Sequence, residues 1–72
     1  MNAQIQKAIA FSMEYMVTGQ VAVKVAADED ILDVLADVDY DGMTNEEDGS
    51  YEVWGCDNGE GWRINVTLLH AA

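Results

Sequence analysis

The stretch YEVWGCDNGEGWRINVTLL, residues 51–69, decides the fold of this chain. At its centre, Asn58-Gly59 is a dipeptide that favours a tight β-turn, because both residues tolerate a positive φ. The runs on either side, SYEVWGC and GWRINVTLL, are rich in the β-branched and aromatic residues that strands prefer. We therefore predict an antiparallel β-hairpin.

The second arm of the hairpin has one apolar and one polar face, as a half-buried strand does. Its apolar side chains are Trp62, Ile64, Val66 and Leu68, and they alternate with Arg63, Asn65 and Thr67. In the first arm, Trp54 shares a face with Glu52, so we expect Trp54 to be partly exposed. An exposed tryptophan beside a carboxylate is a candidate anchor for a protein partner. The alternative role for Trp54 is to cover the edge of the sheet.

The residues before the hairpin predict two helices and one strand. Apolar residues recur at helical spacing across residues 3–17, and valines alternate with other residues across 20–26. A second helix follows Asp28, which is a suitable N-cap. The predicted order over a single domain, residues 1–72, is helix, strand, helix, strand, strand. This order favours a small α+β fold in which helices pack on one face of an antiparallel hairpin or sheet.

The charge distribution limits the classes of partner. The chain has 14 Asp and Glu residues against 3 Lys and Arg, and its net charge is −11. Every acid except Glu14 lies within residues 28–60, a window that contains no Lys or Arg. Such a negative field repels nucleic acids and anionic membranes and attracts cations and basic protein surfaces. We therefore expect a basic, nucleic-acid-binding protein as the partner, with no direct contact to nucleic acid or membrane.

The segment DVDYDGMTNEED, residues 37–48, places oxygen-bearing side chains at the spacing of a calcium loop. It resembles an EF-hand loop, and more closely the dockerin variant, in which Asp stands at the last ligand position. The resemblance implies that Ca²⁺ would be held by Asp37, Asp39, Asp41, Asn45 and Asp48. The segment departs from the EF-hand pattern because a predicted strand follows where the second helix should begin. The other interpretation is a solvated acidic turn.

The same carboxylates are also candidates for imitating DNA. On the predicted second helix, Asp30, Asp33 and Asp37 recur at helical steps and would share one face. That face would continue through Asp39, Asp41, Glu46, Glu47 and Asp48, and three more acids, Glu52, Asp57 and Glu60, would lie on or beside the hairpin. B-form DNA carries one negative charge per about 1.7 Å, so the acids of this window match the charge of roughly six to seven base pairs.

In length, net charge and lack of a catalytic motif, the chain resembles the small acidic inhibitors of phages and mobile elements, which include DNA-mimic and anti-CRISPR proteins. The resemblance implies a non-catalytic inhibitor, without a cofactor, that binds a nucleic-acid-handling complex in the cytoplasm of the host cell. The alternatives are a calcium-binding module and an acidic surface that serves only solubility. A chain this short buries only about 60% of its unfolded surface, so homodimerisation would add useful buried area.

Overall fold

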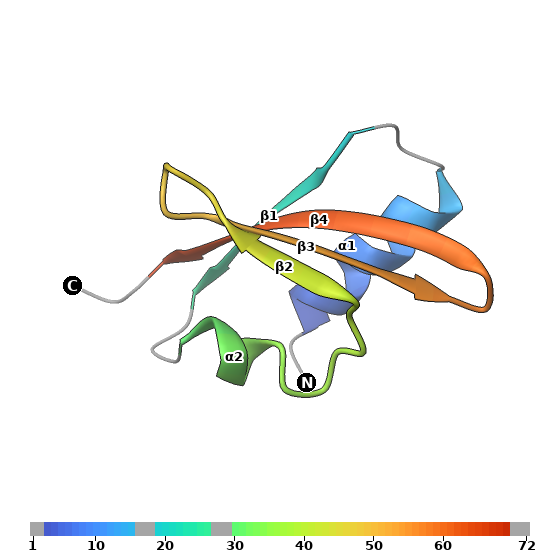
Figure 1. Cartoon of the computed structure of the whole chain (residues 1–72), viewed down its shortest axis with the longest axis horizontal. Coiled ribbons are helices and arrows are strands. Elements are labelled where there is room, and N and C mark those ends of the chain that lie inside the picture. Colours follow the sequence, from blue (N-terminus) through green and yellow to red (C-terminus); the bar gives the residue numbers. More distant parts are fainter. Residues whose placement is uncertain (1–2, 16–18, 27–29, 70–72) are drawn as a thin grey trace.

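The computed structural model describes residues 3–15, 19–26 and 30–69. Its elements, in chain order, are α1 (Ala3–Glu14), β1 (Val21–Ala26), α2 (Ile31–Val34), β2 (Gly42–Asn45), β3 (Tyr51–Asp57) and β4 (Glu60–Leu69). The strands form a 4-stranded sheet in the order β1-β4-β3-β2 (Figure 1). β1 runs parallel to β4, and the other neighbours are antiparallel. The predicted α+β class is confirmed, but the sheet is mixed and not wholly antiparallel, because β1 pairs in parallel with β4.

The β3–β4 hairpin forms around Asn58-Gly59, as the sequence predicts. Asp57 pairs with Glu60, and the two residues between them have φ values of 52° and 83°. Positive φ at both central positions is typical of the type I′ turn, whose twist matches that of the flanking strands. The turn therefore sets the register of the sheet's two central strands.

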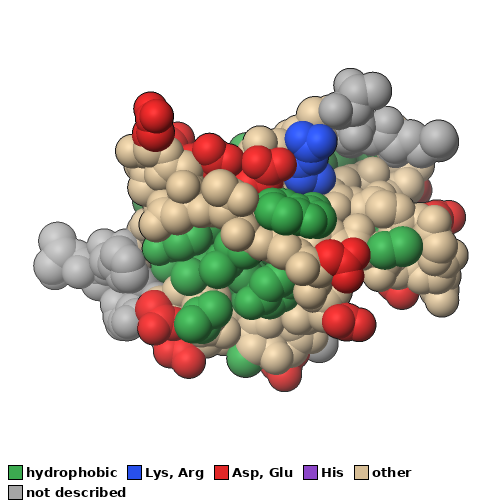
Figure 2. All heavy atoms as spheres, viewed as in Figure 1, with side chains coloured by type: hydrophobic (Ala, Val, Ile, Leu, Met, Phe, Trp, Pro, Cys, Tyr) green, Lys and Arg blue, Asp and Glu red, His purple; other side chains and the backbone are tan. Residues whose placement is uncertain are grey.

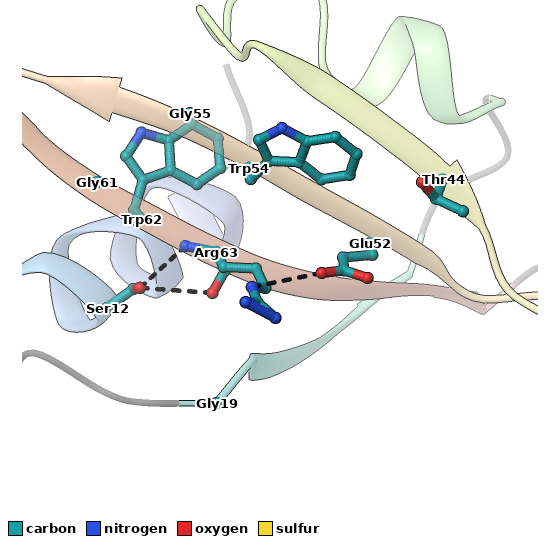
Figure 3. Close-up of a pocket in the computed structure, with 9 residues that line it drawn as sticks. All are labelled: Ser12, Gly19, Thr44, Glu52, Trp54, Gly55, Gly61, Trp62 and Arg63. Carbon is teal, nitrogen blue, oxygen red and sulfur yellow. Dashed lines mark hydrogen bonds and ion pairs between the residues drawn. The ribbon is translucent and has the colours of Figure 1, made fainter.

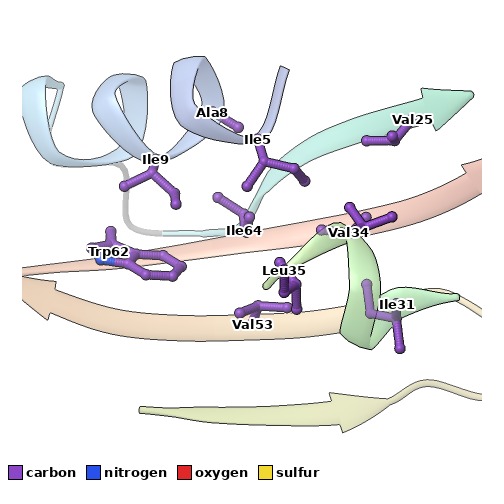
Figure 4. Close-up of a cluster of buried hydrophobic side chains, with 11 residues drawn as sticks. Ile5, Ala8, Ile9, Val25, Ile31, Val34, Leu35, Val53, Trp62 and Ile64 are labelled. Atoms are coloured by element: carbon purple, nitrogen blue, oxygen red, sulfur yellow. The ribbon is translucent and has the colours of Figure 1, made fainter. Parts of the chain in front are cut away.

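Both helices contribute to one hydrophobic core on the same face of the sheet (Figure 4). α1 packs on β1 and β4 through its buried residues Ile5, Ala8 and Ile9, which share one helical face. α2 adds Ile31 and Val34 to the same cluster. The strands supply the fully buried side chains Val25, Val53, Ile64 and Val66. In the part of the chain that the structure describes, no helix is long and apolar enough to cross a bilayer.

Ser12 of α1 bonds to the sheet at a point that β1 does not reach. β1 begins at Val21, which lies opposite Ile64, so Arg63 has no β1 residue beside it. The Ser12 hydroxyl accepts a hydrogen bond from the Arg63 N–H (3.1 Å) and donates one to the Arg63 carbonyl (3.4 Å). The helix therefore satisfies backbone groups that would otherwise lack a strand partner.

The segment between α1 and the hairpin differs from the sequence prediction in two ways. The acidic stretch is not a loop throughout, because Gly42–Asn45 forms β2 and pairs with β3. Met43 lies opposite Val53 and packs against the core, which anchors this short strand. α2 has only 4 residues, and its N-cap is Asp30. The predicted cap, Asp28, and residues 16–17 of the predicted first helix lie outside the described residues.

Candidate functional site

The predicted partner-binding carboxylates lie at the surface, but they do not form one continuous row. They lie at α2 (Asp30, Asp33), in the connection from α2 to β2 (Asp37, Asp39, Asp41) and in the turn from β2 to β3 (Glu46, Glu47). The prediction that Asp30, Asp33 and Asp37 share one helix face is wrong, because α2 ends at Val34. The Asp30 side chain instead caps the helix by accepting the Asp33 N–H at 3.1 Å.

The turn from β2 to β3 is held by a hydrogen-bond network around Ser50, which is only 2% exposed. The Asp48 carboxylate accepts the Ser50 N–H (2.9 Å) and the Ser50 hydroxyl (2.5 Å). The Ser50 oxygen in turn accepts a hydrogen bond from the Asn65 side-chain amide at 3.0 Å. The two bonds donated by Ser50 stabilise the charged carboxylate and hold the pKa of Asp48 below its ordinary value.

Glu46 and Glu52 form a pair of carboxyl groups beside this turn. A hydrogen bond to Glu52, partial desolvation and the neighbouring negative charges together raise the pKa of Glu46 above its ordinary value. Glu52 also forms an ion pair with Arg63, whose Nε lies 3.3 Å from Glu52 Oε1. The turn therefore carries more negative charge than Arg63 neutralises. A cation from another molecule would reduce the repulsion among these carboxylates.

The connection from α2 to β2 lies against the tip of the β3–β4 hairpin. Asp37 and Asp39 line a surface hollow of about 210 Å³ together with Asp57, Cys56 and Trp62. Asp57 was not among the predicted partner-binding residues, and the fold brings it to them from the end of β3. The hairpin therefore extends the acidic surface beyond the segment that the sequence singled out.

The structure does not gather the predicted calcium ligands around one point. β2 runs through the segment, and at about 3.3 Å per residue an extended strand holds Asp41 and Asn45 roughly 13 Å apart. The Asp48 Oδ1 atom already accepts two hydrogen bonds from Ser50. Among the described residues, no group of three or more His, Cys, Asp or Glu is arranged to hold a metal ion. The strand is therefore the feature that separates this segment from an EF-hand loop.

Trp54 lies on the outer face of the sheet, which is the face opposite α1 and α2. It is 38% exposed there, in agreement with the prediction. Its indole covers Gly42 of the neighbouring β2, and a Cβ at position 42 would collide with the ring. With Thr44, Glu52 and Arg63, Trp54 lines a surface hollow that also reaches Trp62 and Ser12 (Figure 3).

Hydrophobic side chains gather over α2 and β2, with carboxylates around their margin (Figure 2). The large apolar side chains that are exposed or partly exposed there are Leu32 of α2, Val38 and Tyr40 of the connection, Met43 of β2 and Tyr51 at the start of β3. We call the surface formed by α2, residues 35–41, β2 and residues 46–49 the acidic face. An apolar centre inside a charged rim is the usual layout of a protein–protein interface.

Two features in and beside this surface are not evident from the sequence. The sequence pattern predicts a loop at β2 because its 4 residues carry a single core-facing side chain, Met43, which is too little for a visible alternation. Glu52 lies on β3 beside the acidic face, where it pairs with Glu46 and Arg63, and its position on the same face as Trp54 was the available signal for it. The run Met43-Thr44-Asn45, uncharged within an acidic segment, was the signal for β2.

In comparisons with protein-family models, curated proteins and solved structures, no match to this chain was found.

Proposed function

We propose that this protein is a non-catalytic inhibitor that binds a basic, nucleic-acid-handling protein complex through its acidic face. The observation that carries the proposal is the apolar centre of that face with carboxylates around it (Figure 2). An apolar centre supplies affinity when it is buried, and a charged rim selects a partner of opposite charge. The resemblance in size and charge to DNA-mimic and anti-CRISPR proteins favours the same role in the host cytoplasm.

The charge balance of the chain supports a partner rich in Lys and Arg. Three basic residues cannot neutralise 14 carboxylates, so most of the acids have no internal counter-charge. The folded domain holds them together in spite of their mutual repulsion. A basic groove that normally receives the phosphates of DNA or RNA would relieve that repulsion, and the protein would then exclude the nucleic acid. Affinity should fall as the salt concentration rises.

Charge reversal with a matched control tests the proposal. Asp33→Lys with Glu47→Lys changes two corners of the acidic face, and neither side chain has a role in the hydrogen-bond networks described above. Glu14→Lys with Glu60→Lys makes the same change in net charge elsewhere, on α1 and at the start of β4. The immobilised wild-type protein and both variants are exposed to extract from the source cell. Each retained protein is then purified and assayed for nucleic-acid binding with and without this protein.

We expect the wild-type and control proteins to retain a nucleic-acid-binding protein that the acidic-face variant does not retain. We also expect the wild-type protein to displace nucleic acid from that partner. Equal loss of retention in both double variants would mean that only net charge matters. Retention without displacement of nucleic acid would contradict an inhibitory role.

A further inference from the structure

We propose that the open edge of β2 is a docking strand, to which an extended, basic segment of the partner adds as a further strand of the sheet. This inference rests on the proposed function, which supplies the positive charge of the partner. What it adds is the mode of binding. The occupant is an extended peptide segment with Lys or Arg near both ends of the paired stretch. Its backbone would bond to β2, and its charged ends would lie near Asp41 and Glu46.

The hydrogen-bond pattern shows which groups of β2 point outward. Among the described residues, β2 is the last strand of the sheet, with β3 as its neighbour. Just after the strand, the Glu46 N–H donates to the Ser50 carbonyl at 2.8 Å, so position 46 faces β3. In an antiparallel pair, successive residues alternate between facing the neighbour and facing away. Thr44 therefore faces β3, whereas the backbone N–H and C=O groups of Met43 and Asn45 face the open edge.

β2 is short, but its 4 residues include no charged side chain and no proline, two features that oppose pairing with a second chain. Natural edge strands are protected by charged side chains, especially Lys, or by Pro. β2 has the sequence GMTN, which contains neither. The strand at the other side of the sheet, β1, carries Lys24, which would repel a basic segment. β2 lies instead between Asp41 and Glu46, whose charges attract one.

The two sides of the β2 edge offer different surfaces to the side chains of an added strand. On the outer face, Gly42 has no side chain, so the indole of Trp54 reaches across β2 toward the edge of the sheet. On the helix-covered face, Met43 is partly buried against the core. Side chains of an added strand would alternate between these two faces, since the side-chain period of a strand is two. This is the arrangement of known strand-addition sites, where backbone bonds supply affinity and side-chain contacts supply specificity.

The first test uses a synthetic peptide with lysine at each end and valine and threonine alternating between them. The control peptide has the same residues with alternate backbone amides methylated, so it keeps the charge but cannot pair along its length. Amide exchange is followed by NMR for each residue of β2. In the free protein we expect slow exchange at Thr44 and fast exchange at Met43 and Asn45. With the unmethylated peptide at about 90% occupancy, exchange at Met43 and Asn45 should slow about tenfold.

The second test changes one backbone donor without changing any charge. Asn45→Pro removes an N–H that faces the open edge, and the Asn45 side chain is exposed, so the ladder to β3 remains. Asn45→Val is the matched control, because it keeps the N–H. We expect Asn45→Pro to weaken peptide binding about tenfold and Asn45→Val to bind as the wild-type protein does. If Asn45→Pro also lowers the melting temperature, its loss of binding is not specific to the open edge. The amide exchange of Met43 and Asn45 in the wild-type protein then decides whether the peptide pairs with β2.

The outcomes separate this inference from the proposed function. Equal binding of both peptides, or no protection of Met43 and Asn45, would overturn strand docking. If Asp33→Lys with Glu47→Lys still weakens binding in that case, the acidic face stands as a purely electrostatic site. If the charge reversal changes nothing for either peptide, the proposed function fails as well. An absence of any binding to the unmethylated peptide at millimolar concentration also overturns strand docking.

Discussion

The indole of Trp54 on β3 occupies the space that a side chain at Gly42 of β2 would need. The two residues are register partners on the outer face of the sheet, so the glycine and the tryptophan depend on each other. A second pair repeats the arrangement on the helix-covered face, where Trp62 of β4 covers its partner Gly55 of β3. The two rings differ in exposure, 38% for Trp54 and 5% for Trp62. That difference predicts how each glycine responds to substitution.

Alanine substitutions at three strand glycines should therefore rank in a definite order. Gly55→Ala should destabilise most, by about 2–3 kcal/mol, because buried Trp62 cannot move aside. Gly42→Ala should cost about 1 kcal/mol, because the exposed Trp54 ring can swing away from the sheet. Gly61→Ala is the control, since the nearest atom to its added Cβ would be 3.9 Å away. Thermal melts measure the order, at roughly 4–8 °C per kcal/mol for a domain of this size.

Tryptophan fluorescence gives a second readout for the same variants. Gly42→Ala should make Trp54 more accessible to a neutral quencher such as acrylamide, whereas Gly61→Ala should leave quenching unchanged. If Gly42→Ala has the melting temperature and the acrylamide quenching of the wild-type protein, the Trp54 ring does not pack on Gly42.

Ser12→Ala should destabilise the fold by about 1–3 kcal/mol, because the partly buried N–H and C=O groups of Arg63 lose their hydrogen bonds to the Ser12 hydroxyl. The loss should be local as well as global, so amide exchange at Arg63 should accelerate more than exchange at Ile64, which lies opposite β1. Equal acceleration at both positions would indicate that Ser12 acts only through the packing of α1.

Stability should first rise and then fall as the pH is lowered from neutrality. The raised pKa of Glu46 means that the folded protein takes up a proton there more readily than the unfolded chain, so stability increases as pH falls through that pKa. The lowered pKa of Asp48 has the opposite effect. Its contribution is present above the ordinary Asp pKa and is lost as pH falls through the lowered value.

Two substitutions separate these contributions in thermal melts across the acid range. Glu46→Gln should remove the rise on mild acidification, because no carboxyl remains at that position to take up the proton. Ser50→Ala should reduce the fall at lower pH, because Asp48 loses the bonds that depress its pKa, and it should also lower stability at neutral pH. If the rise in stability on mild acidification persists unchanged in Glu46→Gln, it comes from the other carboxylates.

Calcium should stabilise the protein no more than magnesium or sodium chloride does at matched ionic strength. A specific site at 100 times its Kd would add about 2.7 kcal/mol, a shift that a thermal melt detects easily. We expect similar, smaller shifts from all three salts, caused by screening of the carboxylates. A large shift with calcium alone, abolished by Asp37→Ala with Asp41→Ala, would restore the calcium interpretation of residues 37–48.

The sequence by itself determined the features that depend on neighbouring residues. Asn58-Gly59 set the hairpin turn, the strict alternation through Trp62, Ile64 and Val66 set the buried face, and the helical spacing of Ile5 and Ile9 set the core side of α1. The partial exposure of Trp54 followed from the same alternation. The sign and position of the charge were also readable, because they need no fold to be counted.

Only the tertiary structure decided how the acidic residues are grouped and which edge of the sheet is open. β2 exists because Met43 reaches the core opposite Val53, a contact between strands that gives almost no signal within a strand of 4 residues. β2 interrupts residues 37–48, which a calcium site would need as a continuous loop. It also separates the carboxylates of residues 37–41 from those of residues 46–48 and leaves Met43 and Asn45 facing the sheet edge. The physical reason is that strand pairing and packing over long sequence separations outweigh weak local preferences in short segments.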